Sequence, residues 1–107
     1  MDEIRIRWLP TAINHLDEHC TFLSQRNEKA AYELYVRIIQ AANIFKTFPL
    51  AGPIEPLLSG MSVNYRSLVV EPHYKLIYMV AGSFVEIHAV WDCRQDTLSL
   101  KYMMGKL

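Results

Sequence analysis

Apolar and polar positions follow two different periods at the start of this chain. Ile4, Ile6 and Trp8 alternate with two arginines, which is typical of a strand with one buried face. Pro10 ends this strand and suits the first turn of a helix. Apolar residues then recur every three or four positions, so the pattern predicts a helix from about Pro10 to Ser24. Its buried stripe would be Ile13, Leu16, Cys20 and Leu23.

A second helical period begins after a short polar link. Asn27 is a suitable N-cap, and Glu33 and Arg37 are spaced to form an ion pair on the outer side. The expected buried stripe is Ala31, Leu34, Ile38, Ala41 or Ala42, Phe45 and Phe48. Pro49 and the glycine and proline that follow it would end the helix. Because the link is so short, the two helices should form an antiparallel hairpin.

Three runs with strand character follow a loop over about 50–62 that is rich in Pro and Gly. The strands are expected at about Val63–Val70, Tyr74–Val80 and Phe84–Trp91. Their connections have the length of hairpin turns, so neighbouring strands should be antiparallel. The segment Leu98–Met104 fits either a last helical turn or a terminal strand. The predicted class is therefore α+β, in the order β-α-α-β-β-β. The helical hairpin would pack on a small antiparallel sheet in a single domain, residues 1–107, that the first strand joins.

Charge and composition narrow the range of functions. Eleven Lys and Arg residues balance eleven Asp and Glu residues, so only a local basic patch could attract nucleic acid. No apolar run is long enough to span a membrane, and the first residues do not resemble a signal peptide, which predicts a cytoplasmic protein. Cys20 and Cys93 lack the spacing of metal ligands and are expected to be buried or half-buried free thiols.

One face of the predicted sheet carries the candidate chemistry. If the strand registers match, Arg66, Lys75, Glu86 and His88 share the face away from the helices. In the last strand, Val85, Ile87 and Ala89 would point the other way. Arg94 would stand just past the strand end, beside Trp91. Cations among aromatic rings on an open sheet could bind phosphates and bases. Alternatively, this is an ordinary polar sheet face, stabilised by cross-strand pairs such as Lys75 with Glu86.

The remaining histidines and the tryptophans have simpler interpretations. His88 could act as a general acid or base, whereas His73 reads as a loop residue beside a proline. His15 and His19 are four residues apart and could bind a metal, but no third ligand is evident, which favours a solvated helix face. Both tryptophans are expected to pack in the core or at the sheet edge. No hydrolase or dinucleotide-binding motif is present, and no cofactor is predicted.

At these residues the chain resembles the RelE/ParE superfamily of bacterial toxins, the plasmid stabilisation protein family, whose members are the stable partners in type II toxin–antitoxin pairs. The resemblance covers nearly the whole chain. Its motifs, besides the early helix, are the F-P-L-A-G of Phe48–Gly52, Tyr65-Arg66-x-Leu68, the Y-K-L-I-Y of Tyr74–Tyr78, and the V-W-D-C-R-Q-D of Val90–Asp96. It implies a cognate antitoxin partner, which would bind the groove along the helical hairpin or an exposed sheet edge.

The resemblance also implies one of two activities. RelE-like members enter the ribosome and cleave messenger RNA without a metal, acting as endoribonucleases. By position, Arg66, Lys75 and Arg94 would then be catalytic cations, and His88 or Tyr102 would transfer the proton. ParE-like members share the fold but poison DNA gyrase without catalysis. The neutral charge departs from the nuclease pattern, since ribosome-directed members tend to be basic. A non-toxic antitoxin-binding module is a third alternative.

Overall fold

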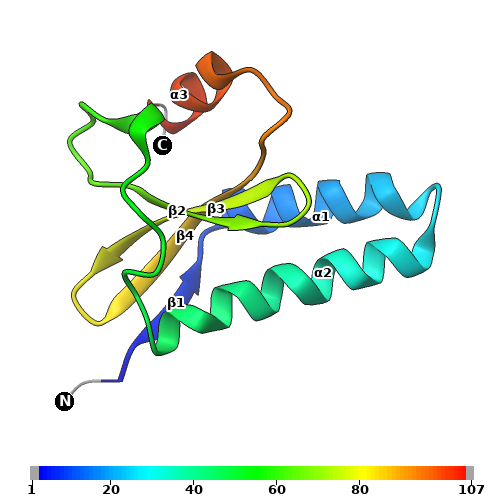
Figure 1. Ribbon diagram of the computed structural model, residues 1–107, viewed down its shortest axis with the longest axis horizontal. Coiled ribbons are helices and arrows are strands. Elements are labelled where there is room, and N and C mark those ends of the chain that lie inside the picture. The colour runs from blue at the N-terminus through cyan, green and yellow to red at the C-terminus, as the bar shows by residue number, and fades with distance from the viewer. Residues whose placement is uncertain (1–2, 106–107) are drawn as a thin grey trace.

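The N-terminal half is a strand followed by a helical hairpin (Figure 1). The computed structural model describes residues 3–105. Strand β1 (Arg5–Trp8) leads into α1 (Pro10–Ser24), which begins at the predicted proline. Helix α2 (Glu28–Asn43) is capped by the Asn27 side chain, which accepts a hydrogen bond of 3.0 Å from the Ala30 amide. A short 3₁₀ helix, Ile44–Lys46, follows it. The predicted hairpin is confirmed.

The sheet has four strands in the order β1-β4-β3-β2. Strands β2 (Arg66–Val70), β3 (Tyr74–Ala81) and β4 (Phe84–Asp92) are antiparallel neighbours, as predicted, and β1 joins at the edge, parallel to β4. A third helix, α3 (Thr97–Gly105), ends the described chain. Of the two predictions for the segment Leu98–Met104, the helix is therefore confirmed and the terminal strand is wrong. The predicted α+β class and element order are confirmed, with α3 as an addition. The sheet is mixed rather than wholly antiparallel, because β1 runs parallel to β4.

The sheet is covered on both faces, which corrects the expectation of an open face. The hairpin packs on one side, where α1 and α2 bury their stripes against β3 and β4. On the other side, α3 and a 3₁₀ turn at Pro56–Leu58 cover a second apolar core. That core consists of Leu58, Tyr65, Ile77, Ala89, Trp91, Leu100 and Met104. We call these two sides the hairpin face and the α3 face.

A β-bulge in β4 explains why the predicted alternation fails there. Ala89 pairs with Ile77, and Ile87 pairs with Tyr78. His88 lies between these two pairs and has no partner on β3, so it is the extra residue of the bulge. Ile87 packs on the hairpin face, whereas Ala89 packs on the α3 face. The expectation that Val85, Ile87 and Ala89 point the same way is therefore wrong for Ala89. His88 and Ala89 both face α3 as a result.

His15 and His19 are half-buried rather than part of a solvated helix face, because they close the open edge of β4. Strand β1 pairs with β4 only as far as Ile87. Beyond that point, His15 Nδ1 accepts a hydrogen bond of 3.2 Å from the Val90 amide, and His19 Nε2 donates one of 2.8 Å to the Val90 carbonyl. The two imidazoles thus replace a missing strand and satisfy backbone groups that would otherwise be unpaired.

Several smaller expectations also differ. Ile13 is 51% exposed and Phe48 is 63% exposed, although both belong to predicted buried stripes. Arg37 donates to the Glu71 carbonyl at 3.2 Å and forms no ion pair with Glu33 within the described residues. Cys20 and Cys93 are free thiols, and Cys93 is exposed rather than buried or half-buried. No described helix is long and apolar enough to cross a membrane.

Candidate functional site

Lys75 faces α3, as predicted, but its charge is neutralised inside the protein. Its ammonium group forms an ion pair with Glu55, whose side chain is only 3% exposed. Glu55 lies in the loop before β2 and also accepts a hydrogen bond of 3.2 Å from the Leu57 amide. Since a buried pair of this kind is strongly coupled, Lys75 is not available to a phosphate. The predicted pair of Lys75 with Glu86 is not formed.

Arg66 lies on the opposite face from Lys75, which corrects the predicted grouping. It pairs with Tyr78 in the β2–β3 register, and both side chains reach Gly52. Arg66 Nη1 donates to the Gly52 carbonyl at 2.9 Å, and the Gly52 amide donates to the Tyr78 hydroxyl at 2.8 Å. Arg66 therefore fastens the loop after α2 to the sheet, and the expectation that it faces away from the helices is wrong.

Arg94 lies past the end of β4, as expected, and is held by Asp92. Its Nε and Nη2 atoms donate to the two carboxylate oxygens at 3.0 and 2.8 Å, and its backbone amide donates to Oδ1 at 2.9 Å. These bonds hold the pKa of Asp92 below its usual value. Arg94 borders a cleft with Tyr74 on the hairpin face. The four predicted site residues therefore divide between the two faces. Lys75 and His88 face α3, whereas Arg66 and Arg94 lie on the hairpin face, bonded to Gly52 and Asp92.

His88 is the most unusual polar residue of the α3 face. It is 8% exposed, and neither ring nitrogen has a hydrogen-bond partner in the described part of the chain. Its Nε2 lies 3.5 Å from Oε1 of Glu86, and its ring meets that of Tyr65 edge-on, with centroids 5.2 Å apart. Unpaired buried imidazole is costly, which makes His88 a candidate for binding or proton transfer.

A cavity of about 460 Å³ opens beside His88 on the α3 face. It is lined by Met61, Ser62, Val63, Tyr65, Met79, His88, Met104 and Gly105. The lining is mostly apolar, and no described Lys or Arg contributes to it. Tyr102, the other predicted proton donor, lies on the exposed side of α3 and is not among these residues.

The environment of the cavity sets the protonation of its two titratable residues. Burial lowers the pKa of His88, and the nearby Glu86 carboxylate offsets this only in part. Burial also raises the pKa of Tyr65. At neutral pH, His88 is thus a neutral base and Tyr65 a protonated hydroxyl. Glu86 is itself engaged, because Arg7 donates to its Oε2 at 2.8 Å.

Sequence reasoning missed Glu55, Tyr65 and the lining contributed by α3. The ion pair joins residues 20 positions apart through an irregular loop, so no periodic pattern reveals it. The one available signal was a lone carboxylate between Pro53 and Pro56. No group of three or more His, Cys, Asp or Glu residues within 3–105 could hold a metal ion.

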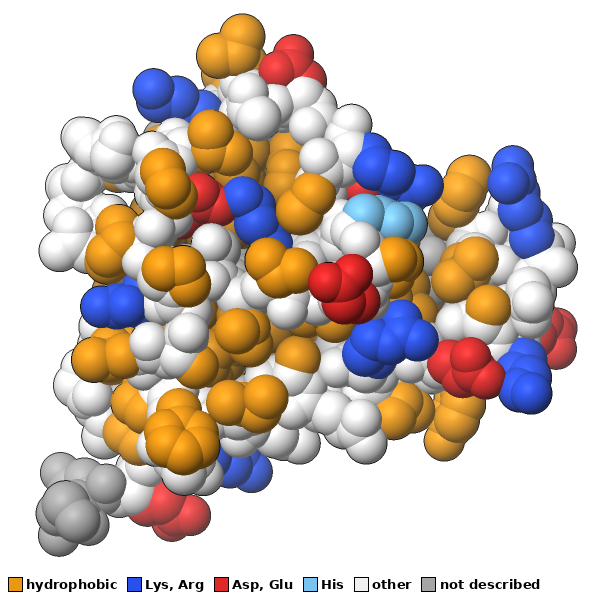
Figure 2. Space-filling model, in the orientation of Figure 1, with side chains coloured by type: hydrophobic (Ala, Val, Ile, Leu, Met, Phe, Trp, Pro, Cys, Tyr) orange, Lys and Arg blue, Asp and Glu red, His pale blue; other side chains and the backbone are white. Residues whose placement is uncertain are grey.

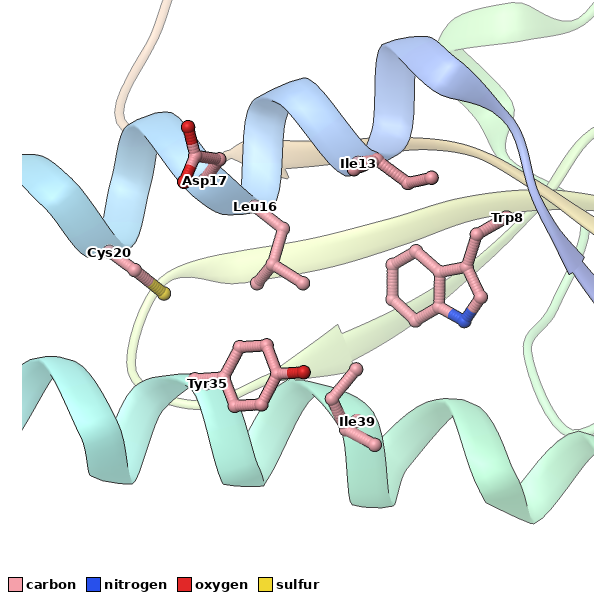
Figure 3. A pocket seen from close by; sticks show the side chains of 7 residues that line it. All are labelled: Trp8, Ile13, Leu16, Asp17, Cys20, Tyr35 and Ile39. Atoms are coloured by element: carbon pink, nitrogen blue, oxygen red, sulfur yellow. The ribbon is translucent and has the colours of Figure 1, made fainter.

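A groove between the two long helices is the second candidate site (Figure 3). Its cavity has a volume of about 380 Å³ and is lined by Trp8, Ile13, Leu16, Asp17, Cys20, Tyr35 and Ile39. In Figure 3 the Trp8 and Tyr35 rings and the Leu16 and Ile39 side chains converge between α1 and α2. Tyr35 is 47% exposed and Ile13 is 51% exposed, so two apolar side chains of the lining face solvent. The groove can accept an apolar segment.

Comparison with known proteins bears on the fold alone. No protein-family model matches the sequence, and no curated protein matches it. Among solved structures, the chain is similar to the chromosomal ParDE TA system from P. aeruginosa, with 16% identity over 84% of this chain and 96% of that one, and a TM-score of 0.69. It is also similar to a YoeB dimer from Staphylococcus aureus, with 18% identity over 83% and 95% of the chains, and a TM-score of 0.54. These likenesses confirm a RelE/ParE-like fold.

Proposed function

We propose that this chain is the toxin of a type II toxin–antitoxin pair and that it arrests growth by binding its target rather than by cutting RNA. The fold supports the toxin assignment. One observation carries the mode of action: the cavity around His88 has no cation in its described lining. The target that the resemblance to ParE-like proteins suggests is DNA gyrase.

The physical argument concerns charge in the transition state. Metal-independent RNA cleavage builds negative charge on the phosphate, and an enzyme needs positioned donors or cations to stabilise it. Here Lys75 is paired with Glu55, and Arg7 with Glu86. Arg66 and Arg94 lie away from His88, bonded to Gly52 and Asp92. The expected cationic cluster is therefore dispersed, which favours a non-catalytic poison.

RNA cleavage is the second candidate, and His88 is the observation that favours it. A neutral, buried imidazole without a hydrogen-bond partner borders a cavity together with a protonated tyrosine hydroxyl. Such a pair could take a proton from one oxygen and supply one to another. Under this alternative, ribosomal RNA or the message itself would have to complete the charge stabilisation.

The groove between α1 and α2 is the proposed contact for the antitoxin. Its exposed apolar lining, Ile13 and Tyr35 above all, would be covered by the apolar side of a partner helix. Covering these side chains would stabilise the toxin by linkage, because the partner binds the folded state alone.

Induction of the chain without its partner tests the proposal. Growth should stop, and DNA synthesis should fall before protein synthesis. Purified protein should also stabilise cleavage complexes of gyrase on DNA. Failure to do so at saturating protein would contradict the gyrase mode.

The same cultures test the second candidate. Cuts in translated messages that vanish in His88→Ala would replace the non-catalytic proposal with RNA cleavage. The Tyr102→Phe variant, measured in parallel, tests the other predicted proton donor. Unimpaired growth would contradict both toxic modes and indicate a non-toxic binding module.

A further inference from the structure

A second cleft lies on the hairpin face, at the far end from β1, between the tip of the hairpin and the β2–β3 turn. It has a volume of about 320 Å³ and lies across the sheet from the His88 cavity. Its walls combine apolar and charged side chains: Phe22, Leu23, Arg26, Ala30, Glu33, Leu34, Arg37, Pro72, His73, Tyr74 and Arg94. In the right half of Figure 2, Lys, Arg and His side chains lie near exposed apolar ones.

Three arginines from three different segments border this cleft. Arg26 comes from the hairpin link, Arg37 from α2 and Arg94 from the turn that follows β4. Arg26 and Arg37 form no ion pair within the described chain, while Arg94 keeps donors beyond the two that it gives to Asp92. Three guanidinium groups offer more N–H donors than the two oxygens of a carboxylate can accept. Their number is better matched to a phosphate group, which has more oxygen acceptors.

His73 adds an unpaired donor or acceptor to the same cleft. Its Nε2 atom is buried and has no hydrogen-bond partner among residues 3–105. The ring stacks against Tyr74, with centroids 4.4 Å apart and an angle of 37° between planes. A buried polar atom with no protein partner is usually satisfied by something outside the protein. Because Nε2 has almost no accessible surface, a ligand oxygen would satisfy it only after the His73 ring turns toward the cleft.

The rest of the cleft fits the other parts of a nucleotide. Phe22 is 62% exposed, and the Arg26 guanidinium lies over its ring, 5.6 Å from the centroid. Exposed rings of this kind can stack on a base. Glu33 is the single carboxylate in the lining. Its negative charge would repel a second phosphate, but its oxygens can accept a hydrogen bond from a sugar hydroxyl. We propose that this cleft binds a nucleoside 5′-monophosphate, either free or as the phosphorylated end of an RNA.

Calorimetric titration of the full-length protein tests this assignment. Adenosine 5′-monophosphate should bind, adenosine should bind at least about tenfold more weakly, and added salt should weaken binding of the monophosphate. Arg26→Gln and Arg37→Gln should each reduce its affinity several-fold. The matched control is Lys46→Gln, which removes a positive charge from the exposed 3₁₀ turn after α2 and should leave affinity unchanged.

Two further titrations, one with short RNAs and one with a phosphoserine peptide, identify the molecule that carries the phosphate. A short RNA with a 5′-phosphate that binds more tightly than both the 5′-hydroxyl RNA and the free monophosphate assigns the site to RNA ends. Equal affinity for the two RNAs, with the free monophosphate bound, assigns it to free nucleotide. Equal binding of adenosine and its monophosphate would overturn the proposal. So would binding of a phosphoserine peptide without binding of the nucleotide. These measurements are separate from growth arrest, so either proposal can fail alone.

Discussion

Gly52 is the residue at which three separate segments meet. It follows α2, and its backbone is bonded by Arg66 from β2 and Tyr78 from β3. A Cβ atom at this position would lie 2.3 Å from the Ser67 carbonyl oxygen. The family-like motifs around Phe48–Gly52, Tyr65–Leu68 and Tyr74–Tyr78 are thus joined through side-chain hydrogen bonds to the Gly52 backbone. At least part of the resemblance reflects folding rather than catalysis.

Gly52→Ala should therefore destabilise the protein. The obstructing atoms belong to the backbone of β2 and cannot turn aside, so we expect a loss of about 1–3 kcal/mol in the free energy of unfolding. Urea denaturation followed by tryptophan fluorescence measures it. Gly105→Ala is the control, because its Cβ would meet only the end of Met61, at 4.0 Å. Equal stability of the two variants would contradict the account.

The ion pair between Lys75 and Glu55 gives a second residue-level prediction. Lys75→Met should cost about 3–5 kcal/mol in the free energy of unfolding, because it leaves the buried Glu55 carboxylate without its counter-ion. The double variant Lys75→Met with Glu55→Gln should recover much of this loss. Chemical denaturation of the wild type, Lys75→Met, Glu55→Gln and the double variant gives the interaction energy of the pair by a double-mutant cycle. A double variant no more stable than Lys75→Met would show that the charge is not the cause.

Among the elements, α1 has a role beyond packing, because its histidines continue the edge pairing of β4. Strand β1 is only four residues long and leaves the end of β4 open. The hydrogen bond from the Val90 amide requires His15 Nδ1 to be unprotonated. Burial lowers the pKa of His15, and the nearby His19 lowers it further. The contact between helix and strand is therefore sensitive to acid.

Stability should fall as the pH drops below the ordinary histidine pKa of about 6.5. In that range the unfolded chain binds a proton at His15 that the folded chain does not, which favours unfolding, whereas above it both states are neutral. The free energy of unfolding, measured from pH 8 to pH 5, should decrease less steeply in His15→Gln. His88→Gln should also flatten the curve, since burial lowers the pKa of His88 as well. Unchanged slopes would contradict both assignments.

At the scale of the whole molecule, the arrangement of layers places the two candidate sites on opposite sides of the sheet. The hairpin presents an apolar groove to solvent, while α3 borders the His88 cavity on the other side of the sheet. A partner bound in the groove would not need to contact the cavity. Under the proposed function, neutralisation and target binding should therefore be separable by mutation.

If the groove binds the antitoxin as proposed, Tyr35→Asp should abolish neutralisation by the partner and leave the arrest of growth intact. The substitution places a charge in an apolar groove, where its burial by a partner helix would be unfavourable. Tyr32→Asp is the matched control, because Tyr32 is 69% exposed on the same helix and does not line the groove. Co-expression with the partner and a pull-down measure the effect. Rescue of Tyr35→Asp by the partner would place the contact elsewhere.

The order and type of the main elements could be read from the sequence. The alternation around Ile6, the stripe of α2 and the Asn27 cap are local signals, and the turns between strands are too short for any arrangement but antiparallel neighbours. Periodicity and turn chemistry depend on residues that are close together along the chain. These signals can therefore be read from a single sequence.

Which groups meet in space was decided by the tertiary structure. The bulge at His88 reverses the side of Ala89, and a loop residue, Glu55, neutralises Lys75. Arg66 turns to the hairpin face because its register partner is Tyr78. Helix α3 then covers the face that strand alternation predicted to be open. Each of these outcomes depends on contacts between distant segments, and such contacts have no period along the chain.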